Sequence, residues 1–91
     1  MSVKKTDIQW VEALGDYITL NTKKGKYTIH STMKTIEDKL PSKDFIRVHR
    51  SFIVRKDIID SIDDNCIAVG ETLIPIGKSY KETVIKNLNV M

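Results

Sequence analysis

The stretch FIRVHRSFIV, residues 45–54, contains two short extended runs joined by a polar His-Arg-Ser interruption. The apolar side chains with the spacing of a buried sheet face are Ile46, Val48, Phe52 and Val54. Arg47 and His49 alternate with them and are expected to point outward. Because Arg50 and Ser51 break the alternation, the pattern predicts two neighbouring strands and a bend that carries Arg50 at its tip.

The flanking sequence predicts a predominantly β domain. Strands are expected over residues 7–13, 17–21, 26–30, 58–63, 66–69 and 72–74. The close spacing of the last three indicates an antiparallel meander. Apolar residues recur at helical spacing over about 32–40, where Ser31 or Thr32 can cap a helix that Pro41 ends. The same spacing predicts a short C-terminal helix over about 79–88.

The length and composition predict a single globular domain. We expect it to span 7–91, after a flexible tail or linker remnant at 1–6. No apolar run approaches the roughly 18 residues of a membrane helix, and the N-terminus lacks the apolar core of a signal peptide. The lone Cys66 excludes an internal disulfide and fits a reducing compartment. We therefore expect a cytoplasmic protein without a membrane partner.

The charges are separated along the chain, although the formal net charge is only +3. Residues 43–56 hold five Lys or Arg and one acidic residue, whereas residues 57–71 hold five acidic residues and no Lys or Arg. Such separated blocks can present one positive face. The alternative is an ordinary solvated surface on which the arginines pair with the acidic block.

Residues that support catalysis or metal binding are sparse. His30 and His49 have no cysteine or carboxylate at metal-ligand spacing, and one cysteine cannot build a zinc site. The four glycines occur singly and form no phosphate-cradling loop. Cys66 begins an apolar run, which favours a small buried side chain over a nucleophile. We therefore expect no enzymatic activity, metal or cofactor.

The arginines favour nucleic-acid binding. An exposed Arg50 on a rigid bend can donate two hydrogen bonds to guanine O6 and N7 or enter a narrow minor groove. Phosphate contacts are expected from Arg47, Arg55 and Lys56 around the stretch at 45–54. A second phosphate site is expected where Lys78, Ser79 and Lys81 begin the C-terminal helix.

Three segments add a family pattern: IQWVEALGDYITL at 8–20, FIRVHRSFIV at 45–54 and LIPIGKSYKETV at 73–84. Together they resemble the LytTR family, the β-rich DNA-binding output domain of many bacterial response regulators. The resemblance implies stacked small antiparallel β-sheets with a helix between two of them. It also implies sequence-specific duplex binding for transcription regulation, with loops instead of a recognition helix entering the grooves.

The resemblance assigns DNA contacts to three loops. Base or groove contacts are expected from Gly15, Asp16, Tyr17, His49, Arg50 and Lys78. The phosphate contacts expected around them are Arg47, Ser51, Arg55, Lys56, Ser79 and Lys81. Alternatively, Arg47 has a structural role, His49 braces the bend and Tyr17 belongs to the core. Lys78 stands where many family members carry arginine, which favours a phosphate contact there.

The expected partner is double-stranded DNA, with two copies of the domain on paired sites. An upstream receiver domain is expected if the chain is a fragment; a stand-alone protein is the other option. A different function also fits the residues, namely a β-rich protein-interaction module whose basic face binds an acidic partner. Single-strand binding is disfavoured because the aromatic residues do not cluster with the arginines.

Overall fold

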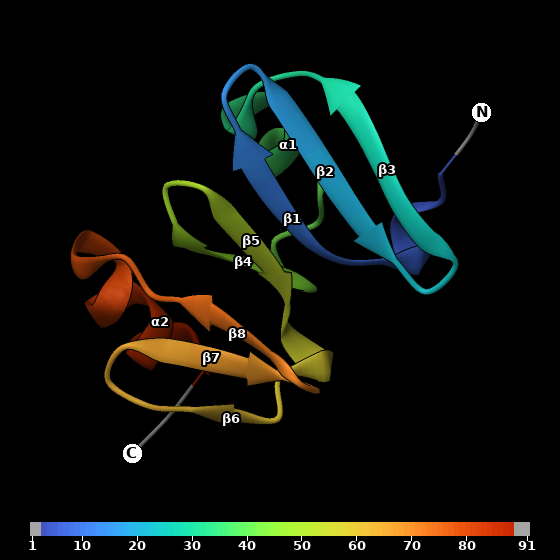
Figure 1. Ribbon diagram of the computed structural model, residues 1–91. Helices are drawn as coiled ribbons and strands as arrows, with labels where there is room; N and C mark the ends of the chain where they lie inside the picture. The colour runs from blue at the N-terminus through green and yellow to red at the C-terminus, as the bar shows by residue number, and fades with distance from the viewer. Residues whose placement is uncertain (1–2, 89–91) are drawn as a thin grey trace.

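The computed structural model describes residues 3–88 (Figure 1). Over this range the helical elements are η1 (Lys5–Asp7), α1 (Met33–Lys39), η2 (Lys56–Ile58), η3 (Lys78–Tyr80) and α2 (Lys81–Leu88), where η marks a 3-10 turn. The strands are β1 (Ile8–Leu14), β2 (Tyr17–Thr22), β3 (Gly25–His30), β4 (Phe45–His49), β5 (Phe52–Arg55), β6 (Ser61–Ile62), β7 (Cys66–Val69) and β8 (Thr72–Pro75). No helix in this part of the chain is long and apolar enough to span a membrane.

The strands form two antiparallel sheets. One has five strands in the order β3-β2-β1-β5-β4, and the other has three in the order β6-β7-β8. In Figure 1, α1 lies behind the larger sheet, while α2 lies beside the smaller one. The predicted mainly β fold, with one internal and one C-terminal helix, is confirmed.

The hairpin β4–β5 contributes to both hydrophobic cores. The core under α1 includes Phe45 and Ile53. The core between the hairpin, the smaller sheet and α2 includes Ile46, Val48 and Val54, with Phe52 partly buried against it. Alternate side chains therefore face opposite cores, which confirms the predicted buried face and adds a second one. The implied position of the internal helix is wrong, because α1 packs on the face of the larger sheet opposite the smaller sheet.

Thr32 caps the N-terminus of α1. The hydroxyl of Thr32 accepts a hydrogen bond from the backbone N–H of Thr35 at 3.1 Å, and the helix ends at Lys39 with Leu40 as its C-cap. This cap selects Thr32 over Ser31 and confirms the predicted helix.

The strand predicted over 58–63 is wrong for most of its length. η2 occupies its start, and only Ser61–Ile62 pair as β6. Ile58 and Ile59 both pack partly against the second core, which two neighbouring residues of a flat strand cannot do. The C-terminal helix also begins differently, since a 3-10 turn at Lys78–Tyr80 precedes the regular helix.

The chain packs against the domain from its first described residue. Val3 is partly buried against the first core, and η1 follows at Lys5–Asp7. The packed region therefore includes residues that the sequence assigned to a tail at 1–6. Residues 1–2 and 89–91, the outer ends of the predicted tail and domain, lie outside the described range.

Candidate nucleic-acid interface

A β-bulge shapes the end of the hairpin β4–β5. Arg47 is opposite Ile53 and His49 is opposite Phe52, so Val48 is the extra residue of the bulge. The carbonyl of Val48 accepts a hydrogen bond from the backbone N–H of Gly77 at 2.8 Å. The bulge therefore ties the bend at 49–51 to the segment at 77–80, which is remote in sequence.

The guanidinium of Arg47 braces this bend from inside. Its Nε donates to the carbonyl of His49 at 2.9 Å, and its Nη2 donates to the carbonyl of Arg50 at 2.6 Å. Its Nη1 donates to Oε1 of Glu37 in α1 at 2.7 Å. With only 18% of the Arg47 side chain exposed, this geometry favours the structural alternative over a phosphate contact.

His49 adds a second brace. Its Nδ1 accepts a hydrogen bond from the backbone N–H of Ser51 at 3.0 Å, and its ring meets that of Phe52 edge-on at 5.6 Å. Because Nδ1 is the acceptor, the ring proton lies on Nε2. The ring therefore fixes the bend as the bracing alternative expects, and Nε2–H remains available as a donor.

The bend and the segment at 77–80 form one hollow. Its lining residues are His49, Arg50, Gly77, Lys78, Ser79 and Tyr80. Arg50, Lys78 and Ser79 are exposed, and neither cation forms an ion pair within residues 3–88. The structure thus brings together two basic features that the sequence presented separately. Ser79 lies inside η3, where Gly77 occupies the cap position.

Gly77 makes this close approach possible. A Cβ added there would lie 2.9 Å from Cδ2 of Tyr80 and 3.4 Å from Cα and Cδ2 of His49. Its φ of −66° is ordinary, so the glycine is needed for space and not for an unusual turn.

We expect Gly77→Ala to destabilise the fold by about 1–3 kcal/mol, because the added methyl group must push the ring of Tyr80 or the bend aside. Urea unfolding measures this change. Ser79→Ala is the matched control, since this side chain is exposed and should alter the free energy of unfolding by less than about 0.5 kcal/mol. Equal stabilities for the two variants would contradict the close packing.

The turn between β1 and β2 lies next to the bend. The backbone N–H of Ala13 donates to the carbonyl of Ser51 at 2.9 Å, and the chain turns immediately beyond, through Gly15 with φ +60°. Asp16 is exposed, and Tyr17 is 54% exposed with its ring against His30 at 5.5 Å. The core alternative for Tyr17 is therefore wrong.

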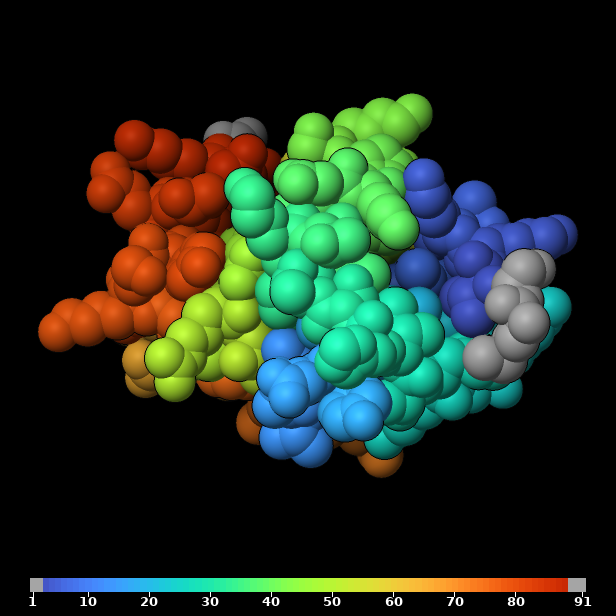
Figure 2. Space-filling model, turned by 90° about the horizontal axis from the view of Figure 1, so that it is seen from above, coloured from blue at the N-terminus to red at the C-terminus, as the bar shows by residue number. Residues whose placement is uncertain are grey.

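These three segments form what we call the loop edge: residues 14–17, 49–51 and 77–80. Figure 2 shows them in order along one side of the molecule as blue, yellow-green and orange atoms. The loop edge contains all six predicted base or groove residues, together with Ser51 and Ser79.

Arg55 and Lys56 do not join the loop edge. Arg55 is opposite Phe45, at the end of the hairpin away from the bend. Its Nε donates to the carbonyl of Ile8 at 2.7 Å, its Nη2 donates to the carbonyl of Lys5 at 2.6 Å, and its guanidinium lies 4.5 Å from the ring centre of Phe45. The phosphate contacts expected from Arg55 and Lys56 would therefore lie at the other end of the hairpin, because β5 carries these residues away from the bend.

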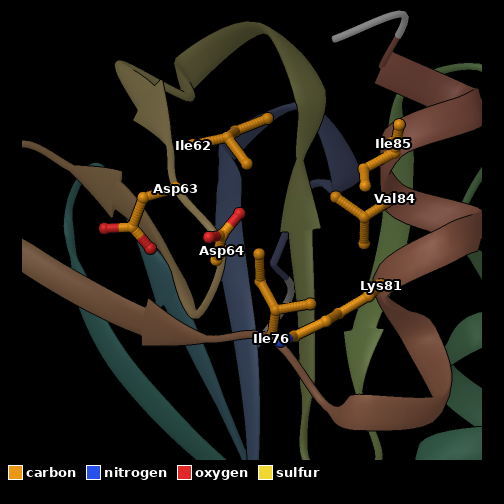
Figure 3. A pocket seen from close by; sticks show the side chains of 7 residues that line it. All are labelled: Ile62, Asp63, Asp64, Ile76, Lys81, Val84 and Ile85. Carbon is orange, nitrogen blue, oxygen red and sulfur yellow. The ribbon is translucent and has the colours of Figure 1, made fainter. Parts of the chain in front are cut away.

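Lys81 also points elsewhere. Its Nζ lies 3.4 Å from Oδ1 of Asn65. Figure 3 shows its side chain extending toward Ile76 in a second hollow. The residues that line this hollow are Ile62, Asp63, Asp64, Ile76, Lys81, Val84 and Ile85. The structure therefore separates Lys81 from Lys78.

The acidic block does not neutralise the arginines. Within the described residues the ion pairs are Arg47–Glu37 and Lys86–Glu82, and neither involves residues 57–71. The alternative of a salt-bridge cluster with this block is therefore wrong.

One carboxylate of the acidic block is held by the backbone of its own turn. The pKa of Asp63 is lowered because its carboxylate accepts hydrogen bonds from the N–H groups of Asn65 and Cys66, each at 2.8 Å.

Cys66, expected to be a small buried side chain, is partly buried. Partial withdrawal from water raises the pKa of its thiol, and the hydrogen bond to Asp63 raises it further. A raised pKa lowers the fraction of thiolate, the reactive form, so these surroundings do not activate the thiol. Within residues 3–88, no three His, Cys, Asp or Glu residues gather as a metal site.

Sequence reasoning missed two residues that support the loop edge. Glu37 holds Arg47 from α1, and the ring of Tyr80 lies 5.8 Å from its guanidinium. The pairing of Glu37 with Arg47 spans ten residues and depends on where α1 packs, so no local pattern signals it. For the contact between Tyr80 and Arg47, the sequence offers only the position of the tyrosine after Gly-Lys-Ser, in the segment at 73–84 that resembles the family.

Comparison with known proteins places this geometry in context. Residues 1–89 match the family model described as the LytTr DNA-binding domain. The chain is 33% identical to the sensory transduction protein LytT of Bacillus subtilis (strain 168), over 97% of this chain and 39% of that protein. It is 31% identical to the LytT protein of Bacillus cereus, over 92% of this chain and 37% of that protein. The chain thus spans less than half the length of these curated relatives.

A solved structure is also similar. It is described as the LytTr DNA-binding domain of a methyl-accepting/DNA response regulator from Bacillus cereus. It matches with a TM-score of 0.87 and 26% sequence identity, over 97% of this chain and 86% of that chain. The similarity extends to the whole arrangement of sheets and helices.

Proposed function

Because the chain belongs to the LytTr DNA-binding domain family, we propose that it binds duplex DNA sequence-specifically through the loop edge and so regulates transcription. The family itself, expected from the sequence, is confirmed. The observation that carries the finer proposal is the gathering of three remote segments on one edge, where Arg50 and Lys78 are exposed and form no ion pair with a carboxylate of residues 3–88.

Each part of the loop edge has a distinct proposed role. The bend presents Arg50 to the edges of bases, because Arg47 fixes the backbone carbonyl of Arg50 itself. Lys78 and Ser79 hold backbone phosphates beside it, and the hydroxyl of Ser51 adds another contact. Tyr17 and Asp16 approach the bases from the neighbouring loop.

The length comparison supports a role within a larger protein. The chain spans 39% of the LytT protein from Bacillus subtilis. We propose that it works as the output domain of a cytoplasmic two-component response regulator with a receiver domain upstream. Two copies on paired sites would add their contacts, which compensates for the small footprint of one domain.

The test is fluorescence anisotropy with a duplex selected from a random pool and with a random duplex, across a salt series. We expect a preference of about 10³-fold or more for the selected duplex, with log K falling linearly with log salt. Equal binding to both duplexes, lost at physiological salt, would contradict the proposal. That outcome would favour the protein-interaction alternative, which requires no sequence preference for DNA.

Lys78→Ala should weaken binding to selected and random duplexes equally and reduce the salt slope by about 1, because a phosphate contact carries no sequence information. The matched control is Lys24→Ala, an exposed lysine in the turn between β2 and β3, at the end of the sheet away from the loop edge. This control should leave the slope unchanged. A base-reading role for Lys78 would instead appear as a loss confined to the selected duplex.

A further inference from the structure

The tip of the β1–β2 hairpin carries two apolar side chains that the fold leaves in water. Leu14 is 76% exposed and Tyr17 is 54% exposed, and the two are opposite each other as the last pair before the turn. Ala13 and Ile18 pack against the first core. By strand alternation, Leu14 and Tyr17 therefore share the other face of the sheet.

Leu14 has no evident structural use. Tyr17 meets the ring of His30 edge-on at 5.5 Å, whereas three quarters of the surface of Leu14 is open to solvent. Single exposed leucines are common, but this one stands on a short hairpin end beside a second exposed apolar ring. Because the paired strands already fix the backbone at this hairpin end, little backbone freedom is lost when a partner covers the side chain.

The surroundings of Leu14 indicate which partner covers it. The hydrogen bond from Ala13 to the carbonyl of Ser51 places the tip beside the bend that presents Arg50. The tip carries the exposed carboxylate of Asp16 and no cation, so it is not suited to phosphates. A narrow minor groove has an enhanced negative potential and disfavours the same carboxylate. The major groove offers what the tip fits, namely thymine methyl groups for Leu14 and cytosine N4 donors for Asp16.

We propose that Leu14 reads the C5-methyl group of a thymine in the major groove, next to the base contacted by Arg50. This assignment rests on the proposed function and adds a specificity residue to it. On this assignment, Leu14 contributes to binding affinity only through an apolar contact with one base pair. Its contribution to affinity should therefore vanish when that one methyl group is removed.

The experiment replaces each thymine of the selected duplex by deoxyuridine, one at a time, which removes only the methyl group. For the unmodified protein we expect deoxyuridine to weaken binding about fourfold at one thymine position, because one methyl group withdrawn from water contributes about that much. Leu14→Ala should bind the thymine duplex about fourfold or more weakly, and it should no longer distinguish thymine from deoxyuridine at that position. Leu73→Ala, which alters a leucine 67% exposed on β8 of the smaller sheet, is the matched control and should keep the discrimination.

The outcomes separate the two proposals. Specific binding with the same deoxyuridine pattern for the unmodified protein and Leu14→Ala, or with no sensitive thymine, overturns the role of Leu14 and leaves the proposed function intact. Failure of the unmodified protein to prefer its selected duplex overturns both. Thermal unfolding of Leu14→Ala checks the fold, and the exposure of this side chain predicts an unchanged midpoint.

Discussion

Replacing Arg50 by alanine should weaken binding to the selected duplex by about 1–3 kcal/mol while random duplex is bound nearly as before. The guanidinium is exposed at the tip of the bend, and the carbonyl of the same residue is held by Nη2 of Arg47 at 2.6 Å. A planar donor on a fixed backbone can bond guanine O6 and N7 together, and it loses little freedom in doing so. Anisotropy with both duplexes measures the difference.

Arg50→Lys is the control that separates charge from shape. It keeps the positive charge but cannot donate two parallel hydrogen bonds to guanine. We expect it to bind random duplex like the unmodified protein and to lose most of the preference for the selected one. Equal losses on both duplexes for Arg50→Ala would show that this arginine supplies only charge.

Replacing Arg47 by alanine should lower the free energy of unfolding by about 2 kcal/mol. The substitution leaves the carbonyls of His49 and Arg50 without their charged donor and removes the partner of Glu37. Binding to selected and random duplexes should then weaken together, since the bend that presents Arg50 loosens. Urea unfolding and anisotropy on the same protein samples measure the two effects.

Glu37→Gln isolates the ion pair from the bracing of the bend. The side chain of Glu37 is 46% exposed, so solvent screens the ion pair, and the loss of unfolding free energy should stay below about 1 kcal/mol. One outcome for Arg47→Ala would contradict the bracing role. If this variant kept the full stability of the fold and still lost affinity equally for both duplexes, Arg47 would have the phosphate role expected from the sequence.

Alternation in FIRVHRSFIV predicted the centre of the fold correctly. Ile46, Val48 and Val54 fall in the second core and Phe52 packs against it, because a period of two places them on one face of a strand. The same pattern failed at residues 58–63, where Ile58 and Ile59 are neighbours and the chain turns instead of extending. Local spacing also gave no sign of the bulge at Val48, since that bulge depends on the register with β5.

The sequence predicted the exposed residues of the candidate site but missed Glu37 and Tyr80, which contact Arg47 behind them. The three loops could be located from motifs, and Arg50 and Lys78 are exposed in them. The sequence grouped Arg55 with Arg50 because they lie five residues apart, whereas a strand separates residues over that distance. The brace from Glu37 and the close approach at Gly77 join segments that only the folded chain brings together.

The most direct test of the loop edge is the map of amide chemical-shift changes when the selected duplex is added to the labelled protein. The largest changes are expected at residues 14–17, 49–51 and 77–80, with small changes in β3 and in the turn between β2 and β3. Changes centred on the smaller sheet, or on Arg55 and Lys56 at the other end of the hairpin, would contradict the proposed DNA-binding surface.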